Sequence, residues 1–312
     1  MTLAISTITS SGIVLTADSR QTYKNQAGAV RIGSDSAAKL FRLNDKCGVS
    51  ISGKAFLKEG TTEKDVGFFV KKFIDAGNAN DKTVKEIAKN LSQYLGSIFV
   101  ATELNALKSL IEERVKKIDG TELIFSASNG INLPYTYQDK DGKSVSDYGR
   151  IDTINMIVAG IDDDKVGRAF TVCVPNEPIN DKDTQLCGAL WVGQTDVMVR
   201  IIKGYAPEIE NLNFVNEALT HNQADTQAQL NQLEYIINWG TITLQDAVDF
   251  CTLMTRTTES VQRFSDGTLL IPGGIPGVGG EIDIAVITVE DGFRWLKQKV
   301  VKTEGYEINL NQ

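Results

Sequence analysis

Short runs of alternating apolar and polar residues open the chain and predict β-strands. Residues 2–8 alternate in this way, and residues 13–17 form a second run after a Ser-Ser-Gly turn. Two further runs, 38–43 and 47–52, flank an Asn-Asp-Lys turn. The pattern therefore predicts that the first fifty residues form a meander of four strands.

Two helical patterns follow these strands. Over residues 62–76, apolar side chains recur every three and four positions, which is the spacing of one helical face. A second helix is predicted to begin at Thr83, because Thr83 and Glu86 can form a reciprocal capping pair. Its apolar stripe continues to Val115, so we expect a long helix with a break near its middle, ended by Gly120.

The remaining chain repeats the same alternation between blocks of strands and blocks of helices. Four apolar runs predict strands, helical spacing then returns twice, and two strands close the pattern (strands 123–127, 154–159, 169–174 and 189–192; helices 207–219 and 243–258; strands 282–289 and 293–297). Because the elements come in blocks, alternating βαβ units are disfavoured and packed layers are favoured. We expect one α+β domain over residues 1–312, built as a four-layer αββα sandwich of antiparallel sheets.

Charge and hydropathy exclude several classes of function. The 312 residues carry a formal net charge of −8, which gives no electrostatic footprint for nucleic acid and little attraction to anionic lipid. No apolar run approaches the roughly 18–20 residues of a membrane span. Arg20 is the first basic residue, so the start lacks the charged region of a secretory signal. We expect a cytoplasmic protein that binds neither nucleic acid nor a membrane.

Cysteine and histidine usage argues against a metal site and against catalysis by a histidine base. The four cysteines stand far apart without a CxxC pair, which supports neither zinc binding nor a disulfide framework. His221 is the single histidine and lies in a polar Asn/Gln-rich stretch. The glycine-rich residues 273–280 precede a strand rather than a helix, unlike a phosphate-binding loop. We expect no metal and no cofactor, and a nucleophile would need a base other than histidine.

Four residues near the start stand at characteristic spacings. Asp18 follows Thr2 by sixteen positions, and Gly53 follows Lys39 by fourteen. In type, order and spacing these residues resemble the proteasome β subunits and the bacterial HslV-like peptidase family, whose mature chains begin with threonine. The resemblance is dense over residues 2–57 and patchy over 150–200 and 240–298, and insertions near 119–150, 222–238 and 264–278 have no obvious counterpart.

The resemblance implies a threonine-type N-terminal-nucleophile hydrolase. Thr2 would be the nucleophile once Met1 is removed, and its own α-amine would be the general base, with a reference pKa of roughly 7.7–8.0. Lys39 would stabilise the anionic side of the reaction, and Asp18 would keep Lys39 charged. The backbone N–H of Gly53 would donate to the oxyanion, a role for which a missing Cβ gives close access.

This chain departs from the family at two further positions. The family carries a mid-chain serine where this sequence has Gln194 or Thr195, and its late aspartate has no clear equivalent, although Asp266 is a candidate. The resemblance also implies that side chains near residues 21, 32 and 46–50 line the pocket that selects the substrate side chain. Each landmark also has an ordinary interpretation: Asp18 as a turn residue, Lys39 as an edge-strand surface lysine and Gly53 as a strand end.

By resemblance, the expected substrate is a polypeptide, and the expected assembly is a homo-oligomer, with a ring as one form and an ATP-dependent unfoldase as a partner. Two alternatives stay open. One is a structural or regulatory shell protein with the same fold and a degenerate site, which the altered serine position favours. The other is a small-amide hydrolase in which the inserted segments close the pocket.

Overall fold

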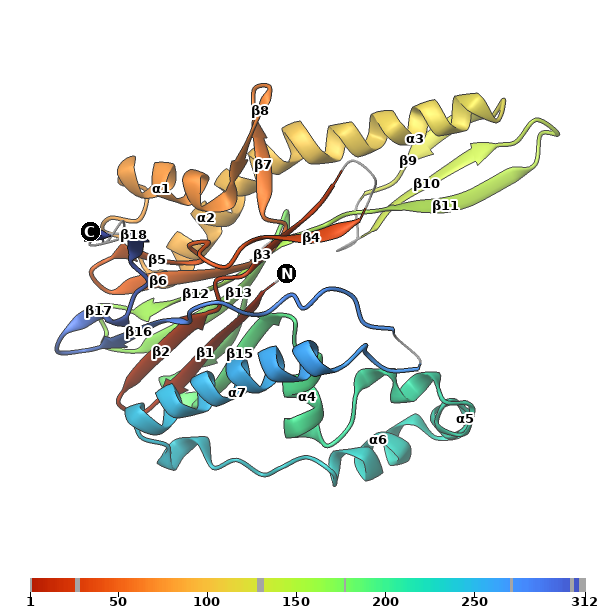
Figure 1. Ribbon diagram of the computed structural model, residues 1–312. Helices are drawn as coiled ribbons and strands as arrows, with labels where there is room; N and C mark the ends of the chain where they lie inside the picture. The colour runs from red at the N-terminus through yellow and green to blue at the C-terminus, as the bar shows by residue number, and fades with distance from the viewer. Residues whose placement is uncertain are drawn as a thin grey trace.

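The chain forms a mixed α+β structure with several antiparallel sheets (Figure 1). A computed structural model describes residues 2–25, 29–127, 132–176, 178–269, 272–303 and 306–308. Met1, which must be removed if Thr2 is to be an N-terminal nucleophile, lies outside the described residues. In the part of the chain that the structure describes, no helix combines the length and the apolar character needed to cross a membrane.

The first five-stranded sheet contains the N-terminal strand at an interior position. Its strands lie in the order β15-β1-β2-β16-β17 (Gly188–Gly193, Leu3–Thr9, Gly12–Ala17, Asp283–Thr288 and Gly292–Lys297). β1 therefore pairs on both sides, with Leu3 opposite Gly193 and Ala4 opposite Ala17. Every residue of β1 is buried, so both faces of this strand are covered.

The second five-stranded sheet has the order β14-β13-β12-β6-β5 (Ile179–Asp183, Gly167–Val174, Ile154–Ile161, Cys47–Gly53 and Leu40–Asn44). The predicted four-stranded meander is therefore wrong, because β1 and β2 belong to one sheet and β5 and β6 to the other. The hairpin of β3 and β4 (Gln21–Lys24 and Val30–Ser34) lies between the two pairs. Hydrophobic alternation identifies a strand but does not specify its partner.

The two sheets pack against each other through one apolar cluster. Ala4, Ile8 and Leu15 of the first sheet belong to the same buried cluster as Leu40 and Ile157 of the second. All five side chains are fully buried. The inward faces of β1 and β2 therefore contact the second sheet, and their outward faces are left to contact helices.

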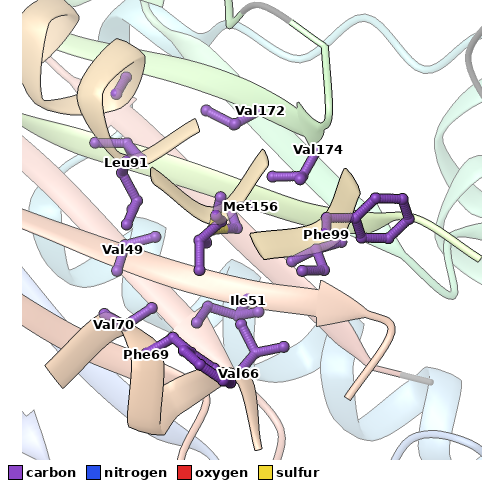
Figure 2. Close-up of a cluster of buried hydrophobic side chains, with 14 of the residues drawn as sticks. Val49, Ile51, Val66, Phe69, Val70, Leu91, Phe99, Met156, Val172 and Val174 are labelled. Atoms are coloured by element: carbon purple, nitrogen blue, oxygen red, sulfur yellow. The ribbon is translucent and has the colours of Figure 1, made fainter. Parts of the chain in front are cut away.

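Helices α1 (Val66–Asp75) and α2 (Val84–Phe99) cover the outer face of the second sheet. Figure 2 shows Phe69 of α1 and Leu91 of α2 packed around Val49 of β6 and neighbouring strand residues. The helix predicted over 62–76 begins only at Val66, because residues 56–65 form the hairpin of β7 and β8 (Phe56–Glu59 and Thr62–Asp65). The Asp65 side chain accepts a hydrogen bond from the Phe68 N–H and caps the helix.

The long second helix is confirmed together with its break. Thr83 and Glu86 form the predicted capping box, and α2 passes through a π-helical segment, η1 (Val100–Leu104), into α3 (Asn105–Lys117). The left-handed residue after the helix is Asp119, with φ 55°, and not Gly120. Gly120 is required instead for close packing, because a Cβ there would lie 2.7 Å from Val115 Cγ1.

Three strands extend beside α3, away from the two main sheets (Figure 1). They are β9, β10 and β11 (Thr121–Phe125, Asn132–Gln138 and Ser144–Arg150), in the order β11-β10-β9. The predicted strand 123–127 overlaps β9, whereas β10 and β11 were not predicted, because Pro134 and Gly149 interrupt their patterns.

Helices α4 (Asp196–Lys203) and α7 (Leu244–Phe264) cover the outer face of the first sheet. Met198 of α4 and Ala247 of α7 are fully buried in one cluster with Ile5 of β1. The chain between them forms the short helices α5 and α6 (Asn213–His221 and Gln223–Asn231) and 3₁₀ turns. The helix predicted over 207–219 is a 3₁₀ turn followed by α5, and α4 was too short to be recognised. The closing hairpin consists of β18 and β19 (Val301–Thr303 and Tyr306–Ile308).

Candidate active site

Thr2 is fixed at the start of β1 by the facing end of β15. Its side chain and backbone are only 3% exposed. The Thr2 carbonyl oxygen accepts a hydrogen bond from the Gln194 N–H at 2.7 Å. Gly193 has φ +99°, and a Cβ at that position would lie 1.9 Å from the same carbonyl oxygen. Only glycine permits this close approach, so Gly193 helps to define the position of Thr2.

Lys39 immediately precedes β5 and reaches across to Thr2. Its Nζ donates a hydrogen bond to Thr2 Oγ1 at 2.5 Å and another to the Arg20 carbonyl. The residue is 8% exposed, which excludes the interpretation as a surface lysine. Burial lowers the pKa of Lys39 to about 8, and the negative charge of Asp18 opposes that shift.

Asp18 follows β2 and is fully buried, so it is not a solvated turn residue. Its Oδ1 lies 3.5 Å from Lys39 Nζ and accepts the Leu3 N–H at 3.0 Å. Its Oδ2 accepts the N–H groups of Arg20 and Gly279, both at 3.0 Å. Burial raises the pKa of Asp18, while the Lys39 charge and the three backbone donors oppose the rise. The carboxylate thereby joins Lys39 to three separate backbone segments.

Gly53 ends β6 beside a cavity that also contains Thr2 and Lys39 in its lining. The cavity volume is about 410 Å³. Gly53 has φ +86°, and a Cβ there would lie 2.2 Å from the Thr153 carbonyl oxygen, so the position requires glycine. The structure therefore brings all four predicted site residues together.

The lining of this cavity differs from the expected one. Gln21 lies in it, as predicted, but most of the lining comes from residues 36–39, 51–55 and 65–68. Neither Ile32 nor residues 46–50 are among the described lining residues. The latter lie within β6 or its preceding turn, where the strand pairs with β5 and β12. A larger cavity, of about 1060 Å³, lies at the start of α2 and contains none of the four predicted residues. The cavity beside Thr2 is therefore distinguished by the Thr2 and Lys39 side chains in its lining and not by its volume.

The positions at which the sequence departs from the expected pattern, Gln194, Thr195 and Asp266, are not among the described lining residues of the cavity beside Thr2. Besides its backbone bond to Thr2, Gln194 accepts a side-chain bond from Gln262 Nε2 of α7 at 2.7 Å. Gln262 Oε1 in turn accepts the N–H groups of Gly277 and Val278. Asp266 lies in the loop after α7, where its carbonyl accepts the Gly273 N–H.

Arg20 and Gly279 are site residues that sequence reasoning missed. The Arg20 guanidinium binds both carboxylate oxygens of Asp35, at 2.6 and 3.1 Å. Gly279 packs against that guanidinium, since a Cβ there would lie 2.5 Å from Arg20 Cζ. Arg20 thus supports the turn whose carbonyl binds Lys39 and the loop whose N–H binds Asp18. The sequence gives little indication of these contacts, because they join Arg20 to Asp35 and to the loop at Gly279, which are far from it along the chain.

The arrangement can activate a hydroxyl group. A threonine oxygen in contact with a buried lysine, which is itself beside a buried carboxylate, combines a nucleophile with a proton donor or acceptor of pKa about 8. Among the described residues, no group of three His, Cys, Asp or Glu side chains could hold a metal ion. His221 ends α5 and is exposed.

Comparison with known proteins adds no relative: no family model matches the chain, and no curated protein matches it.

Proposed function

We propose that this protein is a threonine-type N-terminal-nucleophile peptidase of the proteasome-like family, with Thr2 as nucleophile after removal of Met1. The observation that carries the proposal is the buried contact of Thr2 Oγ1 with Lys39, next to Asp18, at the edge of a cavity. A buried ion pair is costly to maintain, and such perturbed groups gather at functional sites.

In the proposed reaction, the free α-amine of Thr2 accepts the proton of its own hydroxyl as Oγ1 attacks the substrate carbonyl carbon. The resulting tetrahedral intermediate carries its negative charge on the former carbonyl oxygen, to which the Gly53 N–H would donate. As the C–N bond breaks, the proton passes from the α-ammonium to the leaving amine. Water then attacks the Thr2 ester, which releases the acid and restores the hydroxyl.

Lys39 acts in this scheme as a cation that donates to Thr2 Oγ1. Its donation stabilises developing negative charge on that oxygen, and Asp18 stabilises the charged form of Lys39. Because the pKa of Lys39 is about 8, the charged form is present below that pH and is lost above it. The α-amine must be neutral for catalysis, so the scheme requires two groups of similar pKa in opposite protonation states.

The packing of the two sheets supports the αββα sandwich that we propose for the fold. One apolar cluster joins the sheets, a second joins α1 and α2 to one of them, and a third joins α4 and α7 to the other. We extend the proposal to a polypeptide substrate, a homo-oligomeric assembly, an ATP-dependent unfoldase partner and a cytoplasmic location. These extensions rest on the sequence resemblance.

The test begins with the intact mass of the native protein, followed by labelling with a β-lactone or epoxyketone. We expect loss of one methionine and one covalent adduct on Thr2, absent in Thr2→Ala and retained in Thr2→Ser. Retained Met1 with no adduct would overturn the peptidase proposal and favour the shell-protein alternative, which the glutamine at position 194 already motivates. Turnover of small amides without turnover of casein-like chains would favour the small-amide hydrolase.

A further inference from the structure

Ser52 of β6 presents a buried hydroxyl that the proposed reaction does not yet use. The residue is 3% exposed, and its Oγ has no hydrogen-bond partner among the described residues. A buried hydroxyl without a partner costs free energy, so it is expected to meet a group that becomes available in the working protein.

The hydroxyl lies next to the N-terminal residue. Ser52 and Thr2 both line the cavity of about 410 Å³. The position that a Cβ of Gly193 would occupy lies 1.9 Å from the Thr2 carbonyl oxygen and 3.0 Å from Ser52 Oγ. The Thr2 carbonyl oxygen and Ser52 Oγ therefore both lie close to Gly193, which places the serine hydroxyl near the backbone of Thr2.

We propose that Ser52 Oγ hydrogen-bonds, directly or through one bridging water, to the α-amino group that Thr2 acquires when Met1 is removed. This inference rests on the proposed function, because only a processed chain has that amine. Ser52 is then a positioning residue, which orients the amine toward Thr2 Oγ1. Lys39 and Asp18 also lie at this site, where they contact each other and leave Ser52 Oγ unbonded. The other charged residues in the described lining of the cavity are Lys54, Asp65 and Lys71.

The same strand supplies a matched control. Ser50 is two residues from Ser52, so its side chain points to the same face of β6. Ser50 is fully buried, and its Oγ also has no partner within the described chain. Ser50 is, however, absent from the described lining of the cavity that contains Thr2. The two serines thus share burial and lack of a partner and differ in their access to the site.

The experiment compares Ser52→Ala and Ser50→Ala in the full-length protein by thermal unfolding and by the rate of Thr2 labelling with a β-lactone. Ser50→Ala removes a hydroxyl that has no partner, so this variant should unfold at or above the wild-type temperature, whereas Ser52→Ala also loses the proposed bond to the α-amine and should unfold at or slightly below it. We expect Ser52→Ala to be labelled roughly 10- to 100-fold more slowly, the range for loss of one hydrogen bond to a charged group. Ser50→Ala should be labelled at the wild-type rate.

The pH profile separates positioning from a packing defect. A hydroxyl oxygen that accepts from an ammonium favours its charged form, so Ser52→Ala should move the acid limb of labelling to lower pH as well as reduce the plateau. Equal labelling of Ser52→Ala and wild type would overturn the inference, as would a lower unfolding temperature with an unmoved acid limb. If wild type itself were not labelled, the proposed function would fail rather than this extension of it.

Discussion

Replacement of Asp18 by asparagine tests the buried Asp18–Lys39 pair and the backbone hydrogen bonds that hold Asp18. The carboxylate accepts three backbone N–H groups at 3.0 Å and lies 3.5 Å from Lys39 Nζ. Asparagine has the same shape but replaces one acceptor oxygen by a donor amide. If its oxygen keeps the bonds from Arg20 and Gly279, its amide must face the Leu3 N–H and the Lys39 ammonium.

The expected loss of stability has two parts. One buried N–H without an acceptor costs about 1–3 kcal/mol. Without its counter-ion, Lys39 loses its proton, and because its pKa in the wild type is about 8, this removes about 1.4 kcal/mol at pH 7. Together these two parts set an upper limit of about 2–4 kcal/mol on the loss of unfolding free energy in Asp18→Asn at pH 7. The loss is smaller to the extent that the neutral asparagine relieves the buried charge of Asp18, whose pKa burial raises. At pH 9, wild-type Lys39 is already largely neutral, so only the first part remains.

Urea unfolding at pH 7 and pH 9, with the slope checked for two-state behaviour, measures both parts. Asp162→Asn is the matched control, because Asp162 accepts the Val84 N–H at 2.7 Å and pairs with Arg168 at 2.8 Å. A guanidinium keeps its charge at both pH values, so the control should lose equal stability at each. An Asp18→Asn loss that is equal at pH 7 and pH 9 would show that Asp18 does not hold Lys39 in its charged form.

Three further predictions concern the candidate site and the helix α7 that covers the first sheet. Gly193→Ala places a Cβ 1.9 Å from the Thr2 carbonyl oxygen, so both labelling and folding should be lost, whereas Gly142→Ala, at φ +76° with open space around it, should lower stability by only about 1 kcal/mol in urea unfolding. The labelling rate of wild type should decline above about pH 8, as Lys39 loses its proton; a rate that still rises to pH 10 would contradict the role of its charge. Burial raises the pKa of Cys251 to about 12, so alkylation followed by mass spectrometry should leave this thiol unmodified in the folded protein, and its rapid modification would show that α7 opens.

Much of the fold could be predicted because its signals are local. The alternation in β1, the apolar stripe of α2 and the Thr83 capping box each lie within a few consecutive residues. The partners of the strands could not be predicted, since β5 and β6 look like a continuation of the first hairpin and belong to the other sheet. Pairing depends on how the whole chain buries its apolar faces.

Some residues of the candidate site could likewise be predicted from the sequence, and others could not. Asp18 could be proposed from its spacing to Thr2 and Lys39 from its spacing to Gly53, and the structure brings Thr2, Asp18 and Lys39 into contact. Gln262 could not be proposed, because it stands in no recognisable motif. Ser52 directly precedes Gly53 in a recognised strand, but the sequence assigns its hydroxyl no role. Gln262 meets Gln194 across 68 positions. Ser52 shares its burial and lack of a partner with Ser50 and differs from it by lining the cavity that contains Thr2.

The two-sided pairing of β1 also limits which changes in chain length this protein can accept. β1 is held between β2 and β15, and its alternating side chains enter two different cores, with Ile5 toward α7 and Ala4 toward the second sheet. A single-residue insertion or deletion within β1 would exchange these two faces and move a neighbouring residue into the position of Thr2. The strand therefore acts as a spacer of fixed length between the turn at Gly12 and the hydroxyl beside Lys39, and point substitutions will be tolerated in it more readily than changes in its length.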